Sequence, residues 1–187
     1  MENKECISYG LERKTGVNLS HCYQCGKCSA GCVLAEEMDF PPSYLVHLLQ
    51  TKTPANDNRV LRSNAIWICL NCENCIARCP KEVDIPGMMD YLREQARHRG
   101  CINKQAQPVV AFHRSFLQSV KQTGRLYEIG LIAGFKARTL RLLQDVKLVP
   151  AMLLKGKLNI LPESVRDKQK IKKIFAQTIE HPKEKKV

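Results

Sequence analysis

With 187 residues, the chain is long enough for one or two domains with a buried core, and its formal net charge is +12 at pH 7. The charge is uneven: residues 1–100 hold 12 Lys and Arg against 12 Asp and Glu, so residues 101–187 supply the whole positive excess. The best candidate for an apolar span, LVPAMLL from Leu148, is far shorter than the roughly 20 residues that cross a bilayer, so no membrane span is predicted.

Residues 1–20 are polar and lack clear periodicity, and we expect them to form an N-terminal arm in which Gly10 and Gly16 act as breakers. The start, MENKECISYG, lacks the apolar core of a signal peptide, which predicts a reducing, cytoplasmic location. Cys6 is expected to be a free thiol, with contact to a cluster or a partner as the alternative.

Two cysteine runs dominate the next part of the chain: HCYQCGKCSAGC from His21 and CLNCENCIARCP from Cys69. Both have the spacing Cys-x-x-Cys-x-x-Cys-x-x-x-Cys, in which three thiolates hold one [4Fe-4S] cubane and the fourth ligates the other. The pattern therefore predicts two clusters with exchanged ligands. The first thiol set is Cys22, Cys25, Cys28 and Cys79, and the second thiol set is Cys69, Cys72, Cys75 and Cys32.

Zinc or disulfides are the alternatives for these cysteines. Structural zinc usually takes two Cys-x-x-Cys pairs that lie well apart in the sequence, and disulfides need an oxidising compartment. A duplicated run of four cysteines fits neither, so two [4Fe-4S] clusters are the predicted cofactors.

Several neighbours of these cysteines have predicted roles. Gly26 and Gly31 are expected to adopt positive φ, which lets backbone N–H groups approach the sulfur atoms of a cluster. Hydrogen bonds from these groups would raise the reduction potential of the cluster. Lys27 either adds positive charge beside a cluster or is simply solvated. Pro80 fixes the exit of the chain from the second run, whereas Val33 follows the first run.

Between the two runs, the sequence predicts two helices. SYLVHLLQ, which follows Pro41 and Pro42, has leucines at helical spacing and is expected to end at Thr53-Pro54. A second helix is expected to start from a cap at Asn56 or Asp57 and to run through Ile66. It would deliver Trp67 to the second run, either to shield a cluster or to pack in the core.

After Pro80, Asp84 is expected to cap a helix that ends at Gly100, with Met88 and Met89 packed in the core. Strand signals are absent. The predicted fold is therefore all-α: a helical ferredoxin-type domain with two clusters over residues 21–100 and a C-terminal helical extension over 101–187.

The extension is predicted to be helical as well. The first expected helix starts at Pro108 and ends at Gly124, and its apolar stripe consists of Val109, Phe112, Phe116 and Val120. Further helices are expected from Arg125, from Lys136 and over residues 168–177, followed by a charged tail. The extension has few aromatic residues for base stacking, so its basic helices are expected to dock on partner proteins and not on nucleic acid. A solvated basic surface is the alternative.

No catalytic signature accompanies the cysteine runs. The chain has no Gly-x-Gly-x-x-Gly turn, phosphate loop, Ser/His/Asp pattern or zinc-protease motif. Its scattered histidines and Cys101 are not expected to bind metal, although His21 precedes the first ligand and is a candidate for tuning that cluster. A cubane held by four cysteines leaves no open iron site, so the expected chemistry is one-electron transfer without a catalytic residue in this chain.

The paired runs in a helical setting resemble the helical ferredoxin-type domain that fumarate reductase iron–sulfur subunits share with the C subunit of heterodisulfide reductase. The stretch HRSFLQSVKQTGRLYEIGLIAGFK, with its Phe-x-x-Ser-x-x-x-x-Gly-Arg pattern from Phe116 to Arg125, is similar to the region after the clusters in the C subunit of the soluble methanogen enzyme.

This resemblance implies an electron-relay subunit of a cytoplasmic heterodisulfide reductase complex in methanogenesis. Electrons would pass from the A subunit, an iron–sulfur flavoprotein that bifurcates electrons, to the B subunit, whose noncubane clusters reduce the mixed disulfide of coenzyme M and coenzyme B. A hydrogenase or a formate dehydrogenase is a further expected member of the larger complex. The alternatives are a relay subunit of a succinate-, fumarate-, glycolate- or sulfur-metabolising oxidoreductase, and a free ferredoxin.

Overall fold

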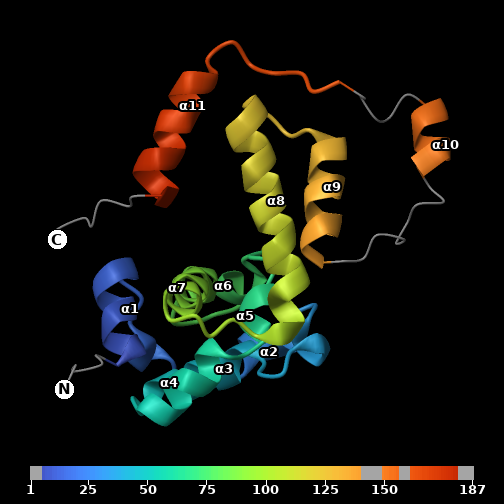
Figure 1. Ribbon diagram of the computed structural model, residues 1–187. Helices are drawn as coiled ribbons and strands as arrows, with labels where there is room; N and C mark the ends of the chain where they lie inside the picture. Colours follow the sequence, from blue (N-terminus) through green and yellow to red (C-terminus); the bar gives the residue numbers. More distant parts are fainter. Residues whose placement is uncertain (1–5, 140–148, 156–160, 181–187) are drawn as a thin grey trace. The chain divides into compact units, whose positions relative to one another are not determined.

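The computed structural model describes residues 6–139, 149–155 and 161–180. Within these ranges every regular element is a helix or a helical turn, in agreement with the predicted all-α class. The chain divides into two compact units, residues 1–107 and 108–187, and each is treated by itself (Figure 1).

The first unit is built from short helices around one longer helix. Its α-helices are α1 (Ile7–Thr15), α2 (Lys27–Ala30), α3 (Pro42–Gln50), α4 (Pro54–Leu61), α5 (Ala65–Ile68), α6 (Asn74–Ala77) and α7 (Ile85–His98). Two 3₁₀ turns lie between them, at Leu19–His21 and Ala35–Glu37, and a third follows α7 at Lys104–Ala106. Helix α7 packs against α1, α4 and α5, and its core residues Met88, Met89 and Leu92 are fully buried, as is Leu45 of α3.

The N-terminal segment differs from the expected polar arm. Residues 7–15 form α1, and Ile7 and Leu11 are 1% and 0% exposed. Gly10 lies inside this helix and does not break it, and a Cβ at this position would meet the side chain of Tyr91 on α7. The apolar periodicity is short, and only packing against α3 and α7 makes the segment part of the core.

The helix expected over residues 56–66 is two helices, α4 and α5. Asp39 causes the break: its carboxylate accepts hydrogen bonds from Ser63 Oγ at 2.6 Å, from Asn64 N at 2.9 Å and from Ala65 N at 2.9 Å. Burial raises the pKa of Asp39, but these donors outweigh it and the net pKa is lowered.

The predicted cap of the second helix was also wrong. Helix α4 begins at Pro54, and Asp57 lies inside it. The Asp57 carboxylate instead accepts a hydrogen bond from the backbone N–H of Ile7 at 2.9 Å, so it caps α1 from a distance of 50 residues in the chain.

Helix α7 follows its prediction closely. The Asp84 carboxylate accepts from Gly87 N at 2.9 Å as an N-cap, Pro86 lies in the first turn, and Gly100 adopts φ 64° directly after the end of the helix. Met88 and Met89 are buried in the core, as expected.

The second unit contains α8 (Gln107–Thr123), α9 (Glu128–Thr139), α10 (Val149–Leu154) and α11 (Lys168–Phe175), which continues into a π-helical turn at Ala176–Glu180. Gly124 ends α8 with φ 83°, as predicted. Ser119 joins the first two helices, since its hydroxyl accepts from Tyr127 N at 2.9 Å.

Two expectations for the second unit differ from the structure. The apolar stripe expected on α8 is not its buried face, because Phe112 and Phe116 are exposed while Ser115 and Ser119 are buried. Helix α9 also continues through Lys136, where a new helix was expected. The remainder of that expected helix, over 140–146, lies outside the described residues.

Candidate iron–sulfur centres

The four cysteines of the second thiol set line one recess in the first unit. Cys69, Cys72 and Cys75 come from the second run, and Cys32 comes from the first. The recess holds about 420 Å³ of empty space, including its opening to solvent. Most of its other lining residues are apolar: Val33, Leu34, Met38, Pro42, Leu70, Ile85, Pro86 and Met89.

The cysteines of the first thiol set are near one another as well. Tyr23 lies close to three of them: the pKa of its phenol is raised, first by desolvation and then by its interactions with Cys25, Cys79 and Cys22. Cys79 belongs to the second run, so this run contributes a thiol to the neighbourhood of the first. The remaining member, Cys28, is buried, and burial followed by the charge of Cys22 raises its pKa.

The two thiol sets are adjacent. Burial raises the pKa of Cys75 to about 11, and the charges of Cys69 and then Cys28 contribute to this shift. Helices α2 and α6, which carry Cys28 and Cys75, pack against each other. A relay between two centres needs this kind of proximity.

The backbone of the two runs repeats the same conformation. Gln24 and Asn71, each two residues after the first cysteine of its run, have φ of 63° and 51°. Gly26 and Glu73, each four residues after that cysteine, have φ of 77° and 62°. This left-handed conformation is unfavourable for residues other than glycine, so three of the four positions carry strain that is held by the surrounding structure.

Gly31 departs from its prediction. Gly26 has positive φ as expected, but Gly31 has φ −101°. Its need for glycine is steric, because the side chain of Arg78 crosses the position that a Cβ would take.

Backbone N–H groups donate to two sulfurs of the first thiol set. Gln24 N donates to Cys22 Sγ at 3.4 Å, and Val83 N donates to Cys79 Sγ at 3.4 Å. Such bonds stabilise negative charge on sulfur and orient the side chain for iron.

An amide side chain anchors the first loop, Cys22–Cys25. Gln50, the last residue of α3, donates from Nε2 to Leu19 O and to Cys22 O, both at 2.8 Å. Its Oε1 lies 2.8 Å from the side-chain amide of Gln24. One neutral residue therefore holds the loop at three points.

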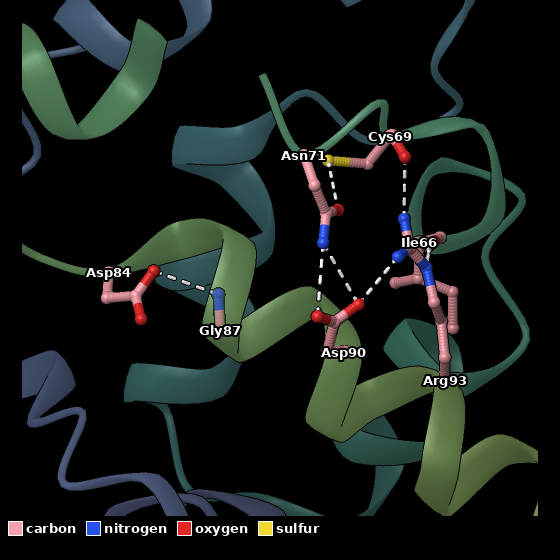
Figure 2. Close-up of polar contacts among 7 residues, drawn as sticks. All are labelled: Ile66, Cys69, Asn71, Asp84, Gly87, Asp90 and Arg93. Carbon is pink, nitrogen blue, oxygen red and sulfur yellow. Dashed lines mark hydrogen bonds and ion pairs between the residues drawn. The ribbon is translucent and has the colours of Figure 1, made fainter. Parts of the chain in front are cut away.

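An ion pair anchors the second loop, Cys69–Cys72, from helix α7 (Figure 2). Arg93 donates from Nη2 to Cys69 O at 2.6 Å, from Nε to Ile66 O, and from Nη1 to Asp90 Oδ1 at 2.7 Å. Asn71 donates to both oxygens of Asp90 at 3.1 Å, and the Cys69 thiol lies 3.6 Å from Asn71 Oδ1.

The residues present fit two cubanes. The half-buried Cys75 thiol has a raised pKa, and a bound iron would supply the positive charge that favours its thiolate. Over the parts of the chain that the structure describes, no three His, Cys, Asp or Glu side chains converge as ligands of a single ion.

The remaining candidate residues lie outside these sets. Trp67 is buried and does not line the recess of the second thiol set, and its Nε1 has no hydrogen-bond partner. Cys6 contacts Ser8 Oγ at 3.1 Å at the start of α1. The Cys101 thiol donates weakly to Ala96 O at 3.7 Å.

Comparison with known families defines the class. Residues 18–83 match the 4Fe-4S dicluster domain, a range that contains all eight cysteines of the two runs. The chain thus carries a two-cluster iron–sulfur domain, and two [4Fe-4S] clusters are its cofactors.

The predicted resemblance to the C subunit of heterodisulfide reductase is confirmed. The chain is 36% identical over 96 residues to the C subunit of the Ferredoxin:CoB-CoM heterodisulfide reductase of Methanosarcina acetivorans, covering 51% of this chain and 37% of that protein. It is 26% identical over 111 residues to the iron-sulfur C subunit of the CoB–CoM heterodisulfide reductase of Methanopyrus kandleri, covering 59% and 56%.

A different enzyme also matches. The 8-methylmenaquinol:fumarate reductase iron-sulfur subunit of Wolinella succinogenes is 28% identical over 121 residues, which is 59% of this chain and 37% of that protein. The chain thus matches less than two thirds of the length of each of these three relatives. Among the described residues, no helix has both the length and the apolar character that crossing a membrane requires.

Proposed function

We propose that this chain is an electron-relay subunit of a heterodisulfide reductase complex. The observation that carries the proposal is the recess in which Cys32 of the first run joins Cys69, Cys72 and Cys75 of the second. A [4Fe-4S] cluster held by four cysteines supplies one-electron oxidation and reduction, without an iron site open to substrate. The protein then has to bind, space and insulate the two centres.

The same arrangement supports the proposed ligand assignment. The first thiol set would hold one cluster and the second thiol set the other, so each run gives its fourth cysteine to the cluster of its partner run. Burial of Cys28 on α2 and the apolar wall around Cys75 would exclude water from the side where the centres meet.

The partners in this proposal are the A subunit, a flavin and iron–sulfur protein, and the B subunit, the disulfide-reducing protein with noncubane clusters. A hydrogenase or formate dehydrogenase would complete the larger assembly in the cytoplasm. Support comes from the names of the relatives, which include the C2 subunit of an H(2)/formate:CoB-CoM heterodisulfide,ferredoxin reductase in Methanococcus maripaludis. In the proposed division of the chain, residues 1–20 precede the cluster domain at 21–100, and the basic residues 101–187 dock on acidic patches of these partners.

Anaerobic co-purification from the native host tests the proposal. About eight irons and eight sulfides per chain are expected for two cubanes, together with a flavin protein and a second iron–sulfur protein in the same complex. Removal of residues 108–187, with the cluster content measured in parallel, should release the partners while both clusters remain. A cluster-free chain in an active complex would contradict the proposal.

The second candidate is the iron–sulfur subunit of a fumarate reductase type of enzyme, which the match to the Wolinella protein favours. The partner isolated with the chain distinguishes the two. A covalent or tightly bound flavin protein that reduces fumarate would support this candidate, whereas reduction of the mixed disulfide of coenzyme M and coenzyme B would support the first.

A further inference from the structure

The two loops are anchored at equivalent backbone atoms by side chains of different charge. In each loop the anchor binds the carbonyl of the first cysteine and the carbonyl three residues before it: Leu19 and Cys22 for Gln50, Ile66 and Cys69 for Arg93. The left-handed residue two positions after that cysteine is also bound in each loop. In the first loop Gln24 contacts Gln50 itself, and in the second loop Asn71 donates to Asp90, the counter-ion of Arg93. The contacts of the two anchors therefore have the same geometry, whereas Gln50 is neutral and Arg93 is charged.

The charged anchor is more shielded from water than its counter-ion. The Arg93 side chain is 21% exposed, whereas that of Asp90 is 62% exposed. Water screens the exposed carboxylate more than the guanidinium, and the guanidinium is the group that contacts the backbone of Cys69 directly. The net field of the pair at the second loop is therefore positive.

We propose that Arg93 is a positioning residue for the second cluster that also raises the reduction potential of this cluster. The inference rests on the proposed two-cluster assignment. Reduction adds an electron to the centre held by the second thiol set, and a fixed positive charge nearby favours the reduced state. Gln50 gives the first loop the same mechanical support without this charge, so the two anchors make otherwise matched centres electrically different.

Asp90 has the opposite effect in this arrangement. It orients Arg93 at 2.7 Å and Asn71 at 3.1 Å, and its negative charge offsets part of the field of the guanidinium. A purely mechanical role for the pair predicts that losing either partner loosens the loop in the same way. An electrostatic role predicts shifts of opposite sign.

The test is a redox titration followed by electron paramagnetic resonance on the anaerobically purified complex, after iron and sulfide analysis has established that both clusters are present. Arg93→Gln, which copies the neutral anchor of the first loop, should lower the potential of one cluster and leave the other unchanged. Asp90→Asn should raise the potential of that same cluster, and Arg93→Lys, which keeps the charge, should stay close to the wild type.

Arg97→Gln is the matched control, since it removes the same charge from an exposed position one turn further along α7 and should shift the potential less. Unchanged potentials in Arg93→Gln, or shifts of the same sign in Arg93→Gln and Asp90→Asn, would overturn the inference. If Arg93→Gln lost its cluster, the direction of the shift in Asp90→Asn would still decide the sign. Absence of two clusters in the wild type would instead defeat the proposed function.

Discussion

The first and second loops have the same backbone conformation, but different side chains hold them in place. Both place left-handed residues two and four positions after their first cysteine. The first loop is held by neutral amides: Gln50 binds its carbonyls, and Asn18 accepts from Ser20 N at 2.9 Å in the 3₁₀ turn before it. The second loop is held by charged groups, Arg93 on its carbonyls and Asp39 at the helix start before it.

This difference shows that cysteine spacing and loop anchoring are separate parts of the sequence. The cysteines are the predicted iron ligands, and each run repeats them at identical spacing. The anchors come from elsewhere, since Gln50 lies on α3 and Arg93 on α7. Charge can therefore be changed at one centre without altering its ligands.

The largest effect is expected from removing single ligands of the two sets. Cys75→Ala and Cys32→Ala should each remove or convert the same cluster, lowering iron from about eight to about four per chain, and electron passage should stop. Cys79→Ala should affect the other cluster, although it lies in the same run as Cys75. Iron analysis and paramagnetic resonance of the reduced complex measure this, with Cys101→Ser as a control that keeps both signals.

A result in which Cys32→Ala and Cys28→Ala remove the same cluster, with Cys75→Ala removing the other, would contradict the exchanged assignment. Each run would then hold its own cluster.

Truncating the anchors should destabilise the protein, and more so at the second loop. Arg93→Ala leaves two carbonyls and Asp90 without their charged donor and should lower stability by about 2–3 kcal/mol, whereas Gln50→Ala should lose about 1 kcal/mol. Thermal unfolding of the anaerobic holoprotein measures the order. Equal losses would show that the charge of the anchor does not contribute.

Removing the capping side chains that precede the two loops, Asp39 before the second and Asn18 before the first, should lower stability in the same order but by smaller amounts. Asp39→Ala removes the acceptor of hydrogen bonds from Ser63 Oγ and from the backbone N–H groups of Asn64, Ala65 and Phe40, and should cost about 1–2 kcal/mol, whereas Asn18→Ala should cost about 0.5–1 kcal/mol. Because its folded-state pKa is lowered, Asp39 contributes stability above its ordinary pKa, and this contribution is lost as the pH falls through the lower, folded-state value. The acid limb of the stability curve should therefore flatten in Asp39→Asn, and an unchanged limb would count against this role.

The smallest effect is expected at the paired left-handed positions. Glu73→Gly should stabilise the protein by about 1 kcal/mol and Gly26→Ala should destabilise it by a similar amount, because only glycine adopts this conformation without strain. Melting temperatures of the two variants, compared with Lys52→Gly at a left-handed position in another loop, test whether the two runs respond alike. A destabilised Glu73→Gly would indicate that this side chain has a role beyond its backbone.

The sequence alone determined the helical class, the helices α3, α7, α8 and α11, and the eight cysteines. These features depend on local spacing: periodic apolar residues, a cap at Asp84, glycines at helix ends, and ligands close together in two runs. The domain division at residues 20 and 100 and the exchange of ligands stay predictions.

Only the tertiary structure decided which distant residues support this framework. Ile7 and Leu11 join the core because α3 and α7 cover them, Asp57 caps a helix 50 residues away, and Asp39 splits one expected helix into two. Arg93 and Gln50 occupy equivalent positions only in the folded structure. Backbone carbonyl groups accept from any donor that the fold brings near, so the spacing of residues in the sequence does not predict which side chain will bind them.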